Sequence, residues 1–194
     1  MRILRLRSAD GMNRLTRNCV AALTQALRDF YREPRPLVVS GNDRSFSAGA
    51  DLNEVAELDA VSSAEFSQTG QELMSAIEHF PAPVIAAISG HCMGGGLDLA
   101  LACRRRVASR TAVFGHRGAA LGLITGWGGT QRLSRLLGKA RATQMLVAAE
   151  KVSAAEALTL GLVTALAEDP VAEAVERIRA GRDGTGGNNS LVLP

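Results

Sequence analysis

The run of residues from 84 to 103 constrains the fold more than any other part of the chain. Val84 to Ser89 is apolar and partly β-branched, without the polar alternation of a half-exposed strand, so it is typical of a strand covered on both faces. It leads directly into Gly90 to Gly96, and Leu97 to Cys103 then forms a helical pattern that is apolar on nearly every side. A buried strand, a glycine loop and a buried helix in this order indicate an α/β protein.

The rest of the chain alternates between strand and helix patterns in the same way. Strands are expected over 3–7, 37–40, 107–109 and 112–114, with 162–163 a brief strand or a connection. Helices are expected over 16–33, 62–80, 128–137, 140–149 and 171–180. Ser62 with Glu65, and Ser153 with Glu156, have the spacing of capping boxes. This order predicts parallel β-α-β crossovers with buried strands.

The length and composition predict one domain. Of the 194 residues, 46% are apolar and 21% are charged, which suffices for one sizeable core and excludes a disordered chain. We therefore expect a single domain over residues 1–180. The segment 181–194 is rich in glycine and asparagine, so we expect it to be a flexible tail.

The ends and the apolar runs of the chain bear on its location. No stretch approaches the roughly 18 uninterrupted apolar residues of a membrane-spanning helix. The first seven residues interleave arginine with aliphatic side chains and lack the apolar centre of a secretory signal. A cytoplasmic protein without a membrane partner is the expectation.

Cysteine and aromatic content narrow the possible partners. Cys19, Cys92 and Cys103 form no CxxC pair, so neither a zinc site nor a disulfide framework is expected, and they are interpreted as small buried apolar residues. The net charge of +3 comes without a polybasic tract, and five Phe, one Tyr and one Trp leave few rings to stack on bases. A metal site and a nucleic-acid partner are therefore not indicated.

Two glycine-bearing segments carry the candidate chemistry. Gly41 to Asp51 is polar and too irregular for a strand or a helix, so it is predicted to be a loop, and Gly90 to Asp98 forms the second loop. Small residues let the backbone approach a ligand closely, and free amides at a helix start stabilise negative charge. Two such donors that converge on one oxygen would form an oxyanion hole. A dinucleotide-binding loop fits poorly, because Gly90 to Gly96 does not have the GxGxxG spacing.

With these segments the sequence resembles the crotonase superfamily, the enoyl-CoA hydratase/isomerase group. The resemblance covers nearly all of residues 14–165. The matching segments, in chain order, are Ser45-Phe-Ser-Ala-Gly-Ala-Asp-Leu52, Ile88-Ser-Gly-His-Cys-Met-Gly-Gly-Gly-Leu-Asp-Leu-Ala100, Phe114-Gly-His116, Leu121-Gly-Leu-Ile124, Gly128-Gly-Thr-Gln-Arg-Leu133 and Ser153 to Val163.

The resemblance implies a fold and an assembly. The fold is the crotonase-like (ClpP/crotonase) spiral of β-β-α units, here with a truncated C-terminal helical segment after 171–180. Longer members of the family add helices that cover the acyl site, so the pocket of this chain is expected to be more open or to be completed by a partner subunit. The implied assembly is a homotrimer or a dimer of trimers.

The resemblance also implies an acyl-CoA ligand. Coenzyme A enters as part of the thioester substrate, and no permanently bound cofactor is expected. The thioester oxygen is implied to lie between the backbone amides of Ala48 and Gly95. The further contacts to substrate or CoA are expected from Ser47, Ala50, Asp51, Leu52 and Trp127. For Trp127, which lies between glycines, an active-site wall, a subunit contact and a core position all stay open.

The acid/base residues depart from the hydratase pattern. Hydratases of this kind use two glutamates, which correspond here to Asp98 and Gly118. Glycine cannot exchange a proton, so the second carboxylate is missing. Asp98 is the best candidate acid/base, and His116, with Arg117 beside it, offers an alternative polar group because imidazole titrates near neutral pH. The alternatives are an Asp98 carboxylate satisfied by helix amides and a structural His116. The run Arg104 to Arg106 is interpreted as helix-dipole compensation on a solvated face.

Two hypotheses follow from these residues. The first is an enzyme, lyase or isomerase, that stabilises a thioester enolate, with isomerisation, decarboxylation or hydrolysis at least as well supported as hydration because of Gly118. The second is a non-catalytic acyl-CoA-binding or scaffolding homologue that keeps the glycine loops.

Overall fold

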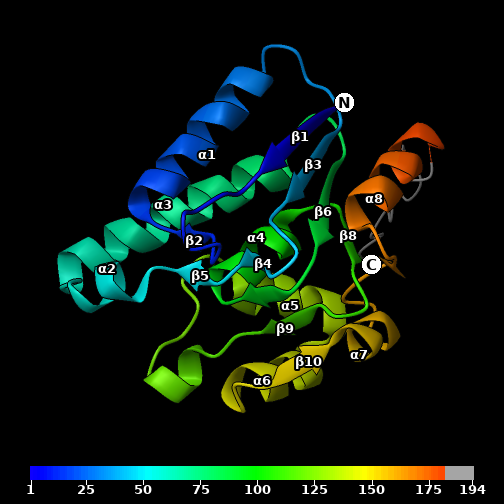
Figure 1. Ribbon diagram of the computed structural model, residues 1–194. Coiled ribbons are helices and arrows are strands. Elements are labelled where there is room, and N and C mark those ends of the chain that lie inside the picture. The colour runs from blue at the N-terminus through cyan, green and yellow to red at the C-terminus, as the bar shows by residue number, and fades with distance from the viewer. Residues whose placement is uncertain (182–194) are drawn as a thin grey trace, which may run out of the picture.

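The computed structural model describes residues 1–181, and its centre is a five-stranded parallel sheet (Figure 1). In spatial order its strands are β1 (Arg2–Arg5), β3 (Leu37–Ser40), β6 (Val84–Ile88), β8 (Arg105–Ala108) and β11 (Ala165–Leu166). Val84 to Ile88 is buried at every position, as the unbroken apolar run predicts. The predicted tail, apart from Gly181, lies outside the described residues.

The remaining strands are short and form a second, smaller sheet and a separate pair. The four-stranded sheet contains, in spatial order, β10 (Lys151–Ser153), β9 (Val113–Gly115), β7 (His91–Met93) and β4 (Ser45–Ser47). A separate parallel pair joins β2 (Arg14–Leu15) to β5 (Gly49–Ala50). The strands β3, β6 and β8 of the large sheet each lead, further along the chain, into a strand of the small one, and helices come next. This repetition confirms the predicted spiral of β-β-α units.

Helices cover both faces of the large sheet (Figure 1). They are α1 (Arg17–Phe30), α2 (Leu52–Ala56), α3 (Ala60–Glu78), α4 (Gly95–Ala102), α5 (Gly129–Leu137), α6 (Lys139–Val147), α7 (Ala154–Thr159) and α8 (Pro170–Arg179), with a 3₁₀ helix η1 (Gly118–Leu121). Alternate residues of β3 divide between two clusters: Val39 packs in the main core with α1 and α3, and Val38 packs with α8. Every residue of α4 is buried, which fits a pattern that is apolar except for Asp98.

Both segments expected to be loops contain strands. Residues 41–51 hold β4 and β5, and residues 90–96 hold β7. These strands are only two or three residues long, and their partners are far away in the sequence: β4 pairs with β7, and β5 pairs with β2. Strands this short show no sequence periodicity. Whether they form depends on neighbouring strands that only the tertiary structure brings close. Similarly, the brief strand expected at 162–163 lies at 165–166.

Two local interpretations also need correction. The capping box of α3 pairs Asp59 with Ser62, so the helix begins at Ala60 rather than after Ser62. Arg106 is buried rather than solvated, and its guanidinium donates to the carbonyl oxygens of Ala100, Cys103 and Leu162. Burial lowers the pKa of Arg106. Its charge still compensates the C-terminal end of α4, as the sequence suggested. By contrast, Ser153 caps α7 by accepting from the Glu156 amide, but the Glu156 side chain pairs with Arg141 and does not complete the expected capping box.

Candidate active site

The start of α4 is closely packed against its neighbours in the site. Gly94 precedes it with φ of +52°, and Gly95 is its first residue. A Cβ atom on Gly95 would lie 2.5 Å from Cζ3 of Trp127, and one on Gly96 would lie 2.6 Å from the carbonyl oxygen of Ser47. Glycine is therefore required here by the close approach of β4 and Trp127. The Gly95 amide, at the first turn of a helix, has no intrahelical acceptor.

Asp98 lies one turn into α4 and is the centre of a polar cluster in an apolar setting. It is 2% exposed. Its Oδ1 lies 2.9 Å from Nε2 of His116, and its Oδ2 accepts a hydrogen bond of 2.6 Å from Oγ1 of Thr125. The two partners are side chains from other segments, not the amides of the helix. The structure thus brings together the two residues chosen from sequence as acid/base candidates.

His116 and Thr125 reach Asp98 from opposite ends of the η1 region. His116 follows β9 and is 5% exposed, and Thr125 lies between η1 and α5. The backbone of α5 closes over the pair: a Cβ atom on Gly129 would lie 2.1 Å from Oδ1 of Asp98 and 2.8 Å from Nε2 of His116. Thr125 and Gly129 were not identified from sequence. Only Gly129 carried a signal, as part of the Gly128-Gly129 motif.

A cavity of about 360 Å³ opens beside this cluster. Of the residues expected at the site, those that line it are Ala48, Ala50, Leu52, Gly95, Asp98, His116 and Trp127. Apolar side chains form much of the remaining wall, and three of them are largely exposed: Leu121, Leu123 and Ile124, the last at 78%. The cavity therefore joins a buried polar floor to an apolar rim.

Ser47 and Asp51 are not among the residues that line the cavity. Ser47 is fully buried, and its hydroxyl donates to the carbonyl oxygen of Asn13 over 2.8 Å and accepts from the Gly49 amide over 3.1 Å. Asp51 caps α2 by accepting from the Asn53 amide over 2.8 Å. Both side chains hold the loop between β4 and α2 in place, which positions the neighbouring Ala50 and Leu52.

The expectation that Ala48 supplies an oxyanion donor is wrong for this structure. The Ala48 amide donates to the carbonyl oxygen of Met12 over 3.0 Å, so its hydrogen is already engaged. The backbone nitrogen of Ala50 is better placed, because it lies 3.4 Å from the position of a Cβ atom on Gly95. The family resemblance placed the donor on Ala48, and a sequence does not show that the carbonyl oxygen of Met12 already accepts from this amide.

Trp127 belongs to both the core and the cavity wall. It is 3% exposed, its ring centroid lies 5.1 Å from that of Phe66, and its Nε1–H donates to the Phe66 carbonyl oxygen over 3.2 Å. Arg117 and Gly118 also line the cavity. A Cβ atom on Gly118 would lie 2.8 Å from the carbonyl oxygen of Leu123, so the position without a carboxylate is also tightly packed.

Over residues 1–181, no helix has the length and apolar character needed to cross a membrane. Within the same range, no group of three or more His, Cys, Asp or Glu side chains could hold a metal ion.

The fold is a β-β-α spiral, and its site holds a helix that starts with glycine and carries a buried carboxylate in its first turn. Comparison with known protein families agrees with the class of protein that these features indicate. The sequence model of the enoyl-CoA hydratase/isomerase family matches residues 2–180. The chain belongs to this family, as the resemblance indicated.

Two curated relatives show how much of the family's length is present. A probable enoyl-CoA hydratase of Bacillus subtilis is 45% identical over 147 residues, which are 75% of this chain and 57% of the relative. A crotonyl-CoA hydratase of Syntrophomonas wolfei is 38% identical over 164 residues, which are 83% of this chain and 63% of the relative. The chain therefore spans somewhat less than two thirds of these relatives.

Solved structures confirm the predicted fold. Pseudomonas aeruginosa DspI superposes with a TM-score of 0.86 at 34% identity and covers 95% of this chain and 71% of that one. Enoyl-CoA hydratase from Thermoplasma volcanium gives a TM-score of 0.87 at 32% identity, with 92% and 72% covered.

Proposed function

We propose that this chain binds an acyl-CoA thioester in the cavity beside α4 and exchanges a proton with the bound acyl group through Asp98. The observation that carries the proposal is the placement of Asp98, buried and fixed by His116 and Thr125, on the floor of a cavity that also contains the start of α4. Coenzyme A is then part of the substrate, and the chemistry needs no resident cofactor.

The backbone would stabilise the charge that forms on the thioester oxygen. Gly95 offers an amide at a helix start, and the Ala50 nitrogen lies next to it. Removing a proton from the α-carbon places negative charge on this oxygen, and each well-placed donor typically lowers such a barrier by about 3–4 kcal/mol. Leu121, Leu123 and Ile124 provide an apolar surface for the acyl chain.

The residues around Asp98 bear on the type of reaction. Water addition needs a group that activates water and a group that delivers a proton to the α-carbon. Asp98 can serve one of these roles, and Gly118 supplies no second carboxylate. His116 is hydrogen-bonded to Asp98, so the two form one proton-holding unit rather than two separated groups. Isomerisation, decarboxylation or hydrolysis therefore fits the site at least as well as hydration, although the two curated relatives above carry hydratase names.

A second candidate function is binding of acyl-CoA without turnover. Gly118 favours it, because the position that would hold the second carboxylate has no side chain. A panel of CoA thioesters incubated with the purified protein and followed by mass spectrometry separates the two. Turnover that is lost in a folded Asp98→Asn variant supports the enzyme, and binding without turnover across the panel supports the second candidate.

The assembly and location of the protein remain proposals of the same kind. We expect a homotrimer or a dimer of trimers on the family resemblance, and the cytoplasmic location stays an expectation from the sequence pattern. Light scattering of the purified chain tests the oligomeric state.

A further inference from the structure

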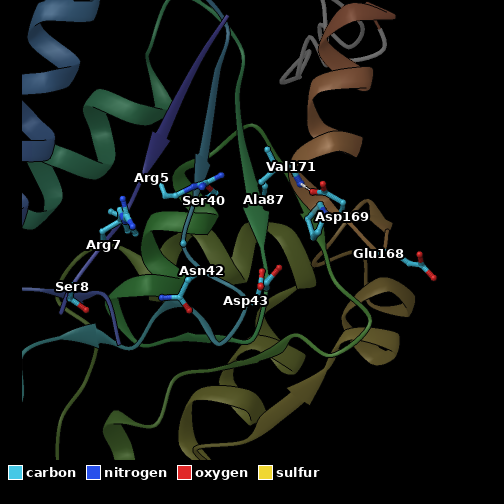
Figure 2. Close-up of a pocket in the computed structure, with 14 residues that line it drawn as sticks. Arg5, Arg7, Ser8, Ser40, Asn42, Asp43, Ala87, Glu168, Asp169 and Val171 are labelled. Atoms are coloured by element: carbon cyan, nitrogen blue, oxygen red, sulfur yellow. Dashed lines mark hydrogen bonds between the residues drawn. The ribbon is translucent and has the colours of Figure 1, made fainter. Parts of the chain in front are cut away.

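A second cleft lies at the carboxyl edge of the five-stranded sheet, between β1 and the start of α8 (Figure 2). Its volume is about 660 Å³, and it shares no lining residue with the cavity beside α4. Arg5 of β1, Ser40 of β3 and Ala87 of β6 are directly paired across the sheet, so their side chains lie side by side on one face. These three residues form the floor of the cleft, and the proposed acyl-CoA function does not use it.

Ser40 is the unusual residue of this floor. It is 2% exposed, and among residues 1–181 its Oγ is the one buried side-chain nitrogen or oxygen atom with no hydrogen-bond partner. Buried hydroxyls in proteins are nearly always satisfied, so an orphaned one calls for a partner outside the protein. On the strand, Ser40 shares its face with Val38, which packs toward α8, so its side chain points toward the cleft.

Two arginines line the same cleft as this hydroxyl. Arg5 is the register partner of Ser40, and Arg7 follows two residues later, on the same side of the extended chain. Figure 2 shows Arg5 beside Ser40, with Arg7 beyond the end of β1. Both side chains are exposed, and within the described part of the chain neither forms a hydrogen bond or an ion pair with another residue. Two guanidinium groups and a hydroxyl thus offer donors without acceptors.

The opposite wall is acidic and limits where an anion can bind. Glu168 and Asp169, which precede and cap α8, line it, and Asp43 lines the cleft from the loop that follows β3. Asp169 caps α8 by accepting from the amides of Val171 and Ala172, so this helix start is already occupied by a carboxylate. The carboxylates therefore repel an anion from the α8 side of the cleft. On the β1 side each arginine guanidinium can donate two hydrogen bonds to it.

We propose that this cleft is a second ligand site, in which Arg5, Arg7 and the Ser40 hydroxyl bind a phosphate group of a small molecule. The unpaired acceptors on the acidic wall suit hydroxyl or ammonium groups on the rest of such a ligand. The phosphate could belong to a free metabolite or to coenzyme A itself, and the proposal is a site for the free ligand, filled independently of the acyl-CoA cavity.

Inorganic phosphate is the probe, titrated at constant ionic strength. The melting temperature of the wild type should rise and saturate with phosphate, since a ligand that binds only the folded state stabilises it. The amide resonances of Leu6, Gly41 and Ser89, which line the cleft, should shift with the same midpoint. The Arg5→Gln/Arg7→Gln variant should bind at least tenfold more weakly. Arg28→Gln, which removes an exposed arginine of α1 on the other side of the sheet, should bind like the wild type.

Ser40→Ala tests the orphaned hydroxyl directly. Without phosphate this variant should melt at the same temperature as the wild type or higher, because an unsatisfied buried group is removed. With phosphate, most of the stabilisation seen for the wild type should be lost. A merely structural serine would lower the melting temperature equally with and without phosphate, and that result would overturn the proposal.

Repeating the titration with saturating coenzyme A distinguishes a free phosphate ligand from the phosphates of coenzyme A. An unchanged phosphate midpoint supports an independent site. Loss of phosphate binding would show that coenzyme A fills the cleft with its own phosphates, and it would overturn the proposal. Equal phosphate effects in the wild type and the double arginine variant would do the same. Failure of acyl-CoA to bind would contradict the proposed function alone, because the phosphate titration does not depend on it.

Discussion

Thr125 donates its hydroxyl hydrogen to Oδ2 of Asp98 over 2.6 Å, across 27 residues of sequence. The other carboxylate oxygen faces Nε2 of His116 at 2.9 Å. With one partner on each oxygen, the carboxylate plane cannot rotate freely. On the proposed function, in which Asp98 exchanges the proton of the acyl group, Thr125 is a positioning residue that acts through Asp98.

Replacing Thr125 by valine tests this role. The change keeps the branched shape and removes the hydroxyl, and a hydrogen bond to a charged group contributes about 1.5–3 kcal/mol. We expect kcat to fall roughly tenfold or more, with a smaller change in KM, and Thr125→Ser to restore most of the rate. Steady-state kinetics on whichever CoA thioester is turned over provides the measurement. A valine variant as fast as the wild type would show that the Thr125 hydroxyl does not position Asp98 for the reaction.

Gly129 should tolerate no side chain while Asp98 is present. A Cβ atom there would lie 2.1 Å from Oδ1 of Asp98, so Gly129→Ala should destabilise the fold by about 1–3 kcal/mol, as overpacking does. In the Gly129→Ala/Asp98→Ala double variant the nearest of these clashes is gone, although Nε2 of His116 and Cγ2 of Thr125 still lie 2.8 and 2.9 Å from the position of the added Cβ atom. Chemical denaturation of the four proteins in this cycle should give a coupling free energy above about 0.5 kcal/mol. Purely additive effects would contradict the contact.

Trp127 should report ligand binding by its fluorescence. It is the one tryptophan of the chain, and its ring lines the cavity and packs against Phe66. An acyl-CoA that enters the cavity changes the polarity and the packing around the indole, so emission should change in intensity or wavelength and saturate with ligand. Free phosphate, whose proposed site is elsewhere, serves as the control. A flat titration, with binding established by another method, would show that the ligand lies elsewhere.

The three cysteines should differ sharply in reactivity. Burial raises the pKa of Cys103 to about 12 and that of Cys92 well above its usual value, whereas Cys19 is only half-buried and its pKa is raised less. Since the thiolate is the reactive form, at pH 8 a thiol reagent should modify Cys19 slowly and the other two only after unfolding. Mass spectrometry of peptides from native and denatured protein locates the labels. Rapid native labelling of Cys92 or Cys103 would contradict their burial.

The sequence predicts this fold well where the pattern is long, and poorly where tertiary contacts decide. Val84 to Ile88 and Leu97 to Cys103 are recognisable because each residue is buried and, apart from Asp98, burial appears directly as apolar composition. The strands β4, β5 and β7 are too short for a periodic pattern, and their partners are brought close only by the folded spiral. They were therefore interpreted as loops.

The same distinction applies to the candidate site, where residues within motifs were predicted and a residue brought close only by the fold was missed. Asp98, His116 and Gly95 were found because motifs carry them. Thr125 was missed because a threonine before a glycine has many ordinary explanations, and only the fold places it within 2.6 Å of a carboxylate oxygen. Ala48 was taken from the family resemblance, and a sequence does not show that its amide already donates to the carbonyl oxygen of Met12.

The most direct test of the account is whether the protein exchanges the α-proton of a bound acyl group through Asp98. A saturated thioester such as butyryl-CoA is incubated with the protein in D₂O, and deuterium at the α-carbon is measured by mass spectrometry. This exchange requires the enolate but not water addition, so the missing carboxylate at Gly118 does not affect it. The wild type should incorporate deuterium, and a folded Asp98→Asn variant should do so about 10²–10⁴-fold more slowly, the range of general acid/base catalysis. No incorporation by a wild type that binds the thioester, or an unchanged rate in the folded variant, would contradict the account.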